Sequence, residues 1–234
     1  MGQSHKYYKI KESWDEKLLG RRSGPQSVKI TTPGFFTDVY PIPPDDESWD
    51  YFAFQKELFA KLDGLQLSGK LDYKKPIDFM CAYYSRITMI ACVSEKVKRI
   101  LEDLNVSREE LTICPITLEG ILETYYVLFS PVLSVKELGL DFSRTLFKDD
   151  SDEGKLYHFS DEKEMLENYN KEGMRYSYKN IVISRNNMCR KIINVQYGGI
   201  FFSETIMDAF AENGVVGYDY IRPGSYFYKE LDFS

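Results

Sequence analysis

An acidic stretch, KDDSDEGK at residues 148–155, gathers the carboxylates of Asp149, Asp150, Asp152 and Glu153. Closely spaced carboxylates on a turn can bind calcium, and Asp149 could open such a loop. The twelfth place of a calcium loop needs a bidentate glutamate, but Ser160 stands there. The loop lacks its strongest ligand, so we interpret it as a solvated acidic turn and expect no calcium site.

Histidine chemistry would have to use His5 or His158, the only two histidines in the chain. Neither has partners at the spacing of zinc ligands, and His158 directly precedes a predicted helix start at Asp161. A catalytic triad would also depend on one of these two side chains. We therefore interpret both as structural or surface residues and expect no metal site.

Signatures of common enzyme classes are absent from the sequence. It contains no G-x-G-x-x-G, G-x-x-x-x-G-K-[ST], H-E-x-x-H or G-x-S-x-G motif. Carboxylate pairs such as Glu102-Asp103 and Glu109-Glu110 fall on predicted helix faces and turns, where charge is expected; a glycosidase would need two carboxylates converging in a cleft. We expect no catalytic residue, no cofactor and no enzymatic activity.

Charge is distributed unevenly along the 234 residues, whose net charge is −6. Residues 1–29 hold seven basic and three acidic side chains, a net +4, so residues 30–234 carry −10. An acidic body repels nucleic acid and suits a basic protein partner, although the charge would also keep the protein soluble without any partner. We therefore expect no nucleic-acid binding.

Cysteine usage and hydropathy indicate the cytoplasm. The four cysteines, Cys81, Cys92, Cys114 and Cys189, form no C-x-x-C pair, and three of them lie in apolar, strand-like segments, which is typical of free thiols. The longest apolar runs, such as YYVLF at residues 125–129, are far shorter than the roughly 20 residues of a membrane span. The N-terminus is charged from Lys6 onward and resembles no secretory signal.

Two segments that would position any site have similar sequences: CVSEKVKRILEDLNV at residues 92–106 and FFSETIMDAFAENGV at residues 201–215. In each, a strand-like end runs into Ser-Glu and then an amphipathic helix, with Ser94 and Ser203 as expected N-caps. Asn105 and Gly214 occupy the matching helix ends, and both residue types tolerate the left-handed conformation. A weak internal strand-helix duplication and chance recurrence both explain this pattern, which marks packing positions and not catalytic ones.

The rest of the chain favours an α+β fold. Gly and Pro residues divide residues 1–45, predicting an N-terminal arm with short strands at 28–32 and 35–40. A helix with one aromatic face (Trp49, Phe52, Phe59, Leu62) is predicted next, capped by Asp46 or Ser48, and a short helix over 161–170. The remaining segments, including 110–118, 125–142, 179–184 and 190–203, are strand-like. Because many strands follow one another without helical crossovers, we predict mixed, largely antiparallel sheets with a few helices on one side, in a single domain over 46–234.

Over residues 77–220 the chain resembles family eleven of the bacterial polymorphic-toxin immunity proteins, formerly a domain of unknown function. The resemblance rests on Val93-Ser94-Glu95 before a helix, on Tyr125-Tyr126 leading to Leu140-Asp141 and Ser143, and on Ser203-Glu204 before a helix that ends at Gly214 and Gly217. It implies a small cytoplasmic, non-enzymatic protein that neutralises a cognate toxin.

We therefore expect a stoichiometric complex with a toxin, and the acidic body suits a basic toxin such as a nuclease. The candidate contact is Asp149, Asp150, Asp152 and Glu153. Two alternatives stay open. One is an enzyme of unrecognised class, such as a hydrolase, with its site in a cleft near Tyr125, Tyr126 or the aromatic tail. The other is a structural or regulatory module that binds through exposed tyrosines.

Overall fold

The computed structural model describes residues 6–20, 24–41, 50–73, 75–82, 88–150, 155–172 and 176–234. It divides the chain into two compact units: unit 1 holds residues 1–11, 132–207 and 220–234, and unit 2 holds residues 12–131 and 208–219. The chain passes between them in β2 (Ile10–Glu12), after Pro131, within α6 (Glu204–Glu212) and in β15 (Tyr218–Tyr220), which pairs with β2. The predicted division into an N-terminal arm over 1–45 and a single domain over 46–234 stays a prediction.

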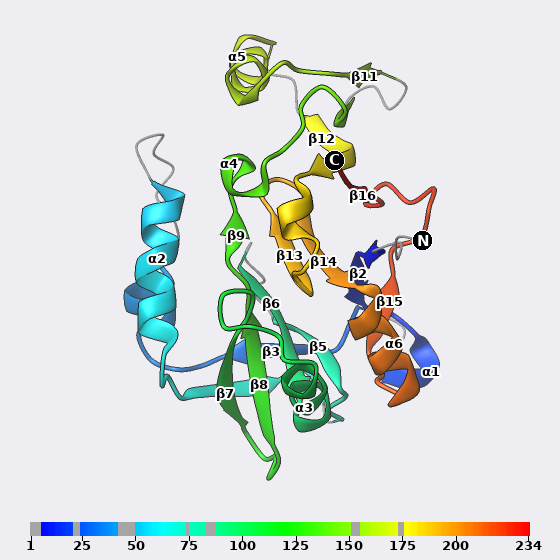
Figure 1. Cartoon of the computed structure of the whole chain (residues 1–234). Coiled ribbons are helices and arrows are strands. Elements are labelled where there is room, and N and C mark those ends of the chain that lie inside the picture. Colours follow the sequence, from blue (N-terminus) through cyan, green and yellow to red (C-terminus); the bar gives the residue numbers. More distant parts are fainter. Residues whose placement is uncertain are drawn as a thin grey trace. The chain divides into compact units, whose positions relative to one another are not determined.

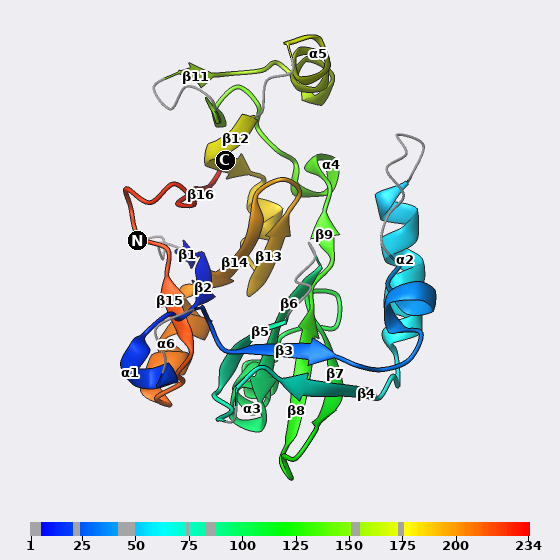
Figure 2. The same cartoon turned by 180° about the vertical axis from the view of Figure 1, so that it is seen from behind.

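Unit 2 is built on a closed barrel in the order β3-β4-β7-β8-β6-β5. Its strands are β3 (Ser27–Ile30), β4 (Leu67–Leu71), β5 (Phe79–Ala82), β6 (Met89–Ser94), β7 (Thr112–Leu118) and β8 (Thr124–Phe129). β3 lies antiparallel beside β4 (Figure 2), and the pairs β3–β5 and β4–β7 are parallel. Fully buried Val28, Ile116 and Val127 belong to its core, as expected for a small barrel whose interior is filled by side chains.

Helices complete unit 2: α1 (Glu16–Leu19), α2 (Tyr51–Leu62) and α3 (Glu95–Asp103). α2 buries Leu58 and Leu62, and Asp50 caps it by accepting hydrogen bonds from the Phe52 and Ala53 amides. The predicted caps Asp46 and Ser48, and Trp49 of the predicted aromatic face, lie outside the described residues.

The prediction of a strand at residues 35–40 is wrong. Phe35–Val39 forms a single π-helical turn, η1, which follows Gly34 in the left-handed conformation. This turn places Phe35 in the core with no exposed surface. Only glycine adopts such a backbone conformation readily, so Gly34 turns the chain before a strand can form.

Unit 1 contains two four-stranded sheets. One has the order β1-β14-β13-β9, with β1 (Tyr7–Tyr8), β14 (Gly199–Ser203), β13 (Ile192–Val195) and β9 (Val132–Leu133). The other has the order β11-β10-β12-β16, with β11 (Leu156–Tyr157), β10 (Leu146–Asp149), β12 (Tyr176–Ile183) and β16 (Glu230–Phe233). Side chains of both sheets share one core, in which Ile193 and Phe201 of the first sheet pack with Phe147, Tyr178 and Ile181 of the second.

The helices of unit 1 are α4 (Val135–Leu138), α5 (Glu162–Glu172) and the 3-10 turn η2 (Arg185–Asn187). α5 confirms the helix predicted at 161–170. α4 interrupts the segment 125–142 that was predicted to be strand-like throughout. Ser134 and Glu137 form a capping box there, and Gly139 ends the helix in the left-handed conformation, so local capping outweighs the strand pattern.

The two similar segments of the sequence fold alike. β6 leads directly into α3, and β14 into α6 (Figure 1). β6 lies between antiparallel β8 and β5, and β5 pairs in parallel with β3. β14 lies between antiparallel β1 and β13, and β13 pairs in parallel with β9. Within the sheets, four strands therefore recur in the same order and directions, with a helix after β6 and after β14. Their order along the chain differs, because β8 follows α3 whereas β1 precedes the other elements of its copy. The α+β prediction is confirmed.

Both repeated helices end in the same way. Asn105 and Gly214 have positive φ angles of 53° and 58°. The Val106 amide donates to the Leu101 carbonyl at 3.0 Å, and the Val215 amide donates to the Phe210 carbonyl at 2.9 Å. These are the six-to-one bonds of a Schellman ending, so the prediction for both helix ends is confirmed.

The N-terminal ends of these helices differ from the prediction. Ser94 is the N-cap residue of α3, but its side chain makes no capping bond and instead donates to Asp78 Oδ1 at 2.8 Å. The Ser203 hydroxyl is buried and has no hydrogen-bond partner among the described residues. The Ser94 amide donates to the Asp78 carbonyl at 2.9 Å, and the Ser203 amide donates to the Lys191 carbonyl at 2.8 Å. Lys191 therefore stands at the position that matches Asp78.

Candidate functional site

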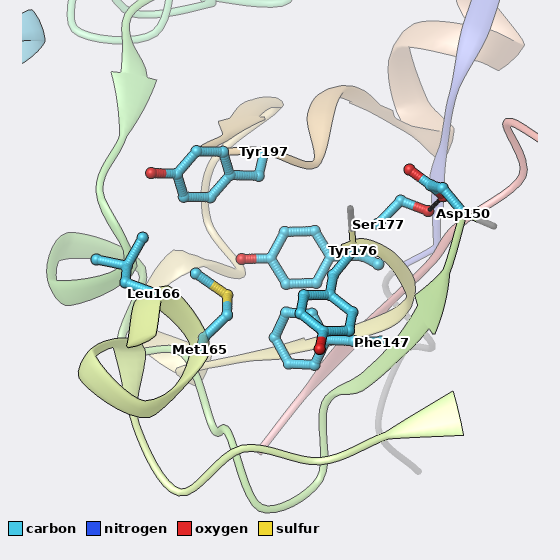
Figure 3. Close-up of a pocket in the computed structure, with 8 residues that line it drawn as sticks. Phe147, Asp150, Met165, Leu166, Tyr176, Ser177 and Tyr197 are labelled. Carbon is cyan, nitrogen blue, oxygen red and sulfur yellow. Dashed lines mark hydrogen bonds between the residues drawn. The ribbon is translucent and has the colours of Figure 1, made fainter. Parts of the chain in front are cut away.

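A pocket of about 530 Å³ lies within unit 1. α5 supplies Met165 and Leu166 on one side, and Ser177 and Asp150 lie on the opposite side (Figure 3). Phe147, Tyr176 and Tyr178 come from β10 and β12, and Tyr197 comes from the turn between β13 and β14. Its volume is in the range of small-molecule sites, roughly 300–1,000 Å³, and its walls are mainly aromatic and aliphatic.

Tyr178 is the most deeply buried polar side chain of this pocket. It is 1% exposed, and its hydroxyl has no hydrogen-bond partner among the described residues. Burial raises the pKa of this phenol well above its usual value, with smaller contributions from Tyr197 and Glu162, so Tyr178 stays neutral. A neutral phenol can donate one hydrogen bond and accept another.

The four acidic residues predicted to contact a toxin do not share one environment. Asp149 is 3% exposed and lies on the same inward face of β10 as Phe147, so its side chain is not at the surface. Asp150 lines the pocket, and the Ser177 hydroxyl donates to its Oδ1 atom at 2.7 Å. Asp152 and Glu153 lie outside the described residues. Of the four predicted residues, the structure therefore places only Asp150 at a candidate site.

Two half-buried lysines bind the carbonyls of the Tyr197 turn. The Lys9 ammonium donates to the Gly198 carbonyl at 2.7 Å, and the Lys229 ammonium donates to the Tyr197 carbonyl at 3.5 Å. Tyr197 has a positive φ of 60°, which non-glycine residues adopt at a cost, and these bonds help to offset it. Sequence reasoning missed both lysines because they lie far from the turn in the chain.

The environment lowers the pKa values of these lysines. Burial, and then the nearby charge of Lys229, lower the pKa of Lys9 to about 7. Burial also lowers the pKa of Lys229 to about 8; the charge of Lys148 lowers it further, whereas Asp150 acts in the opposite direction. Lys9 therefore changes its charge near neutral pH.

Large apolar side chains are exposed at the pocket. Leu166 and Tyr197 line it directly, and Tyr197 is 58% exposed. We call Leu166 and Tyr197 the pocket rim. Tyr226 and Phe227 are also exposed in unit 1, where the Lys148 ammonium lies 3.7 Å from the Tyr226 ring centroid. Lys148 follows Phe147 in β10, so their side chains point to opposite faces of the strand and the contact does not place Tyr226 at the pocket.

Unit 2 has a wider groove of about 990 Å³, beside Tyr126, one of the residues predicted for an enzymatic cleft. Tyr126 donates a short hydrogen bond to Glu95, and Lys98 lies 5.1 Å from its ring centroid. The bond from Tyr126 lowers the pKa of Glu95, while burial and Glu95 raise the pKa of Tyr126 to about 12. At neutral pH Glu95 is thus a weak base and Tyr126 a weak acid, which is unsuited to proton transfer.

The histidines, the cysteines and the possible metal ligands can also be compared with the sequence predictions where the structure describes them. His158 is exposed, with Nδ1 3.1 Å from the Thr145 carbonyl oxygen, and His5 lies outside the described residues. All four cysteines are free, and Cys81, Cys92 and Cys114 lie in strands as predicted. Among the described residues no group of three His, Cys, Asp or Glu side chains could hold a metal ion, and no helix there has the length and apolar character needed to span a membrane.

No protein-family model matches the chain, and no curated protein matches it. The resemblance to immunity proteins therefore stays a prediction.

Proposed function

We propose that this chain is an immunity-type protein that neutralises a cognate bacterial toxin in the cytoplasm by forming a stoichiometric complex with it. The observation that supports this best is the pocket rim, where two large apolar side chains are exposed at one pocket, in a unit that also exposes Tyr226 and Phe227. Single exposed apolar residues are ordinary, but a group of them is typical of a protein-binding surface. Aromatic anchors beside a pocket also supply much of the binding energy of many interfaces.

The charge of the chain supports a basic partner. Residues 30–234 carry a net charge of −10, which would speed association with a basic toxin such as a nuclease. Asp150, at the edge of the pocket, is the acidic residue that we include in the contact. Asp149 is excluded from it because its side chain is buried.

An enzyme with its site near Tyr125 or Tyr126 has less support. Tyr125 is buried, and the pKa values of Glu95 and Tyr126 move away from neutrality in opposite directions. A structural or regulatory module would use the same exposed side chains as an immunity protein. It would differ in the identity of its partner, which the first experiment determines.

The first experiment is capture of the tagged protein from the bacterium that encodes it, with bound proteins identified by mass spectrometry. We expect one stoichiometric partner that carries a toxin domain, and co-expression should restore growth to cells that produce this toxin. If cells that make the toxin yield no such complex, the proposed function is wrong.

The contact surface is then tested with matched variants. Leu166→Ser and Tyr197→Ser should each weaken the complex about tenfold or more, because truncating a central anchor typically costs over 1 kcal/mol. Leu122→Ser is the control, since Leu122 is fully exposed but belongs to unit 2. Unchanged affinity in both rim variants, combined with weaker binding of the control, would place the contact elsewhere.

A further inference from the structure

The unit 1 pocket contains an unsatisfied polar atom. Buried polar atoms nearly always have hydrogen-bond partners, yet the Tyr178 hydroxyl has none among the described residues although it is almost fully buried. Its ring has contacts on other sides: the Phe147 ring centroid lies 4.9 Å away, and the Lys229 ammonium lies 5.8 Å from the Tyr178 centroid. An occupant of the pocket that brings a hydrogen-bonding atom to this hydroxyl would satisfy it.

The pocket walls select a flat apolar group. Tyr176 and Tyr178 are alternate residues of β12, so their rings share one face of the sheet with Phe147, which pairs with Tyr178. Met165 and Leu166 stand on the other side of the cavity, and Tyr197 lies at its edge (Figure 3). Aromatic rings prefer offset-stacked or edge-to-face neighbours, and thioethers also pack well against rings. These walls therefore suit an aromatic ring.

The charges near the pocket favour a neutral occupant. Among the residues that the structure describes, Asp150 is the charged one that lines the cavity, and it accepts a hydrogen bond from Ser177. Lys229 is close enough for Asp150 to affect its pKa, so a resident cation already offsets this carboxylate. A second cation would be repelled by Lys229, and an anion would be repelled by Asp150.

We infer that the unit 1 pocket binds a neutral aromatic ring carrying a hydrogen-bonding substituent, of the kind that a partner's tyrosine side chain presents, with that substituent bonded to the Tyr178 hydroxyl. The identification of a protein as the source of the ring rests on the proposed function. The chemistry of the pocket does not, because it follows from the lining residues alone.

The test measures binding of N-acetyl-tyrosinamide, N-acetyl-phenylalaninamide and N-acetyl-lysinamide to the full chain. The methyl signal of Met165 is followed by NMR, with the methyl signal of Met89, buried in unit 2, as the internal control. Tyrosinamide should bind about threefold to tenfold more tightly than phenylalaninamide, the range expected for one neutral hydrogen bond. Lysinamide should bind most weakly of the three.

Tyr178→Phe removes only an unpartnered hydroxyl and should fold normally. This variant should lose the preference for tyrosinamide while keeping its affinity for phenylalaninamide. Tyr73→Phe, at a tyrosine that does not line the pocket, should keep the preference. Equal affinities for the two aromatic amides, a preference that survives Tyr178→Phe, tightest binding of lysinamide, or no change in the Met165 signal would each overturn the inference.

The two proposals fail separately. If the amides bind as expected but no toxin is captured from cells, the pocket inference stands and the proposed function fails. If a toxin is captured but the amides show no preference that depends on Tyr178, the immunity proposal stands and the pocket inference fails.

Discussion

Asp78 joins three parts of unit 2 through one carboxylate. Its Oδ1 atom accepts from the Ser94 hydroxyl at 2.8 Å, and its Oδ2 atom accepts from the Lys96 ammonium at 2.7 Å and the Val216 amide at 3.2 Å. Its side chain is only 13% exposed. Replacing it with alanine would therefore leave three donors at the start of α3 and after α6 without their acceptor.

The three contacts contribute unequally to the free energy of unfolding. The Ser94 bond reaches a charged, mostly buried acceptor, a type worth about 1.5–3 kcal/mol. The Lys96 pair counts for less, about 0.5 kcal/mol, because Lys96 is 42% exposed and solvent screens the attraction. The Val216 amide lies at an exposed residue and can bond to water after the substitution. We expect Asp78→Ala to destabilise unit 2 by about 2–4 kcal/mol, and Asp78→Asn, which keeps one acceptor oxygen, by about half as much.

Urea unfolding measures the total effect, and amide hydrogen exchange measures the local one. Exchange of the Val216 amide should accelerate in Asp78→Ala. Exchange of the Val106 amide, which is bonded to the Leu101 carbonyl, should change only as much as the global free energy of unfolding changes. Asp63→Ala is the matched control: Asp63 pairs with Arg108 at 3.9 Å, but both side chains are exposed, so its loss should cost less than about 0.5 kcal/mol. If the Asp78 and Asp63 variants lose the same small amount of stability, the reasoning is refuted.

Three further predictions concern matched positions and titrating groups. Ser94→Ala should cost about 1.5–3 kcal/mol because it removes the bond to the Asp78 carboxylate, whereas Ser203→Ala should be neutral or stabilising, since the buried Ser203 hydroxyl has no described partner. Urea unfolding of both variants checks this difference. Lys9 should titrate by NMR with a pKa of about 7, and Lys229→Met should raise that value. The pKa of Lys9 is lower in the folded state than in the unfolded state, so the unfolded state binds more protons between about pH 7 and 10.5. The free energy of unfolding, measured relative to Lys9→Met, should therefore rise with pH over that range. A fall would contradict the lowered pKa of Lys9. Tyr126→Phe should raise the pKa of Glu95 by removing the bond that lowers it most, and an unchanged carboxylate titration would show that the bond is not the cause.

Local patterns predicted the parts of the fold that depend on neighbouring residues. Amphipathic spacing identified α3 and α6, and the residue types at positions 105 and 214 identified their left-handed ends. Closure of the barrel could not be predicted in this way, because the parallel pairing of β3 with β5 joins segments about fifty residues apart. The residue types Asn and Gly indicate a left-handed backbone at their own positions. The residue types of β3 do not indicate which strand it pairs with.

The same distinction explains the outcome at the acidic stretch. A composition argument treats Asp149 and Asp150 alike, but successive residues of a strand point to opposite faces. β10 buries Phe147 and Asp149 and leaves Lys148 more exposed, so adjacent carboxylates have different environments. The pocket itself was beyond prediction, because its residues come from four separate segments between 147 and 197 that only the tertiary fold brings together.

The recurrence of strands and helix bears on where function lies. Chance can produce a strand, a serine and an amphipathic helix twice, but here the flanking strands also match in order and direction, and both helices end in the same hydrogen bond. The copies differ in two respects. Asp78 accepts a hydrogen bond from Ser94 in one copy, and Lys191 stands at the matching position in the other. The connection from Ala82 to Met89 is also longer than the one from Val195 to Gly199. The shorter connection carries Tyr197 to the edge of the unit 1 pocket and is held there by Lys9 and Lys229. A repeated scaffold with a changed loop is how binding residues are commonly added to a stable fold, and it places the distinctive chemistry of this chain at that turn and not in the helices that its sequence repeats.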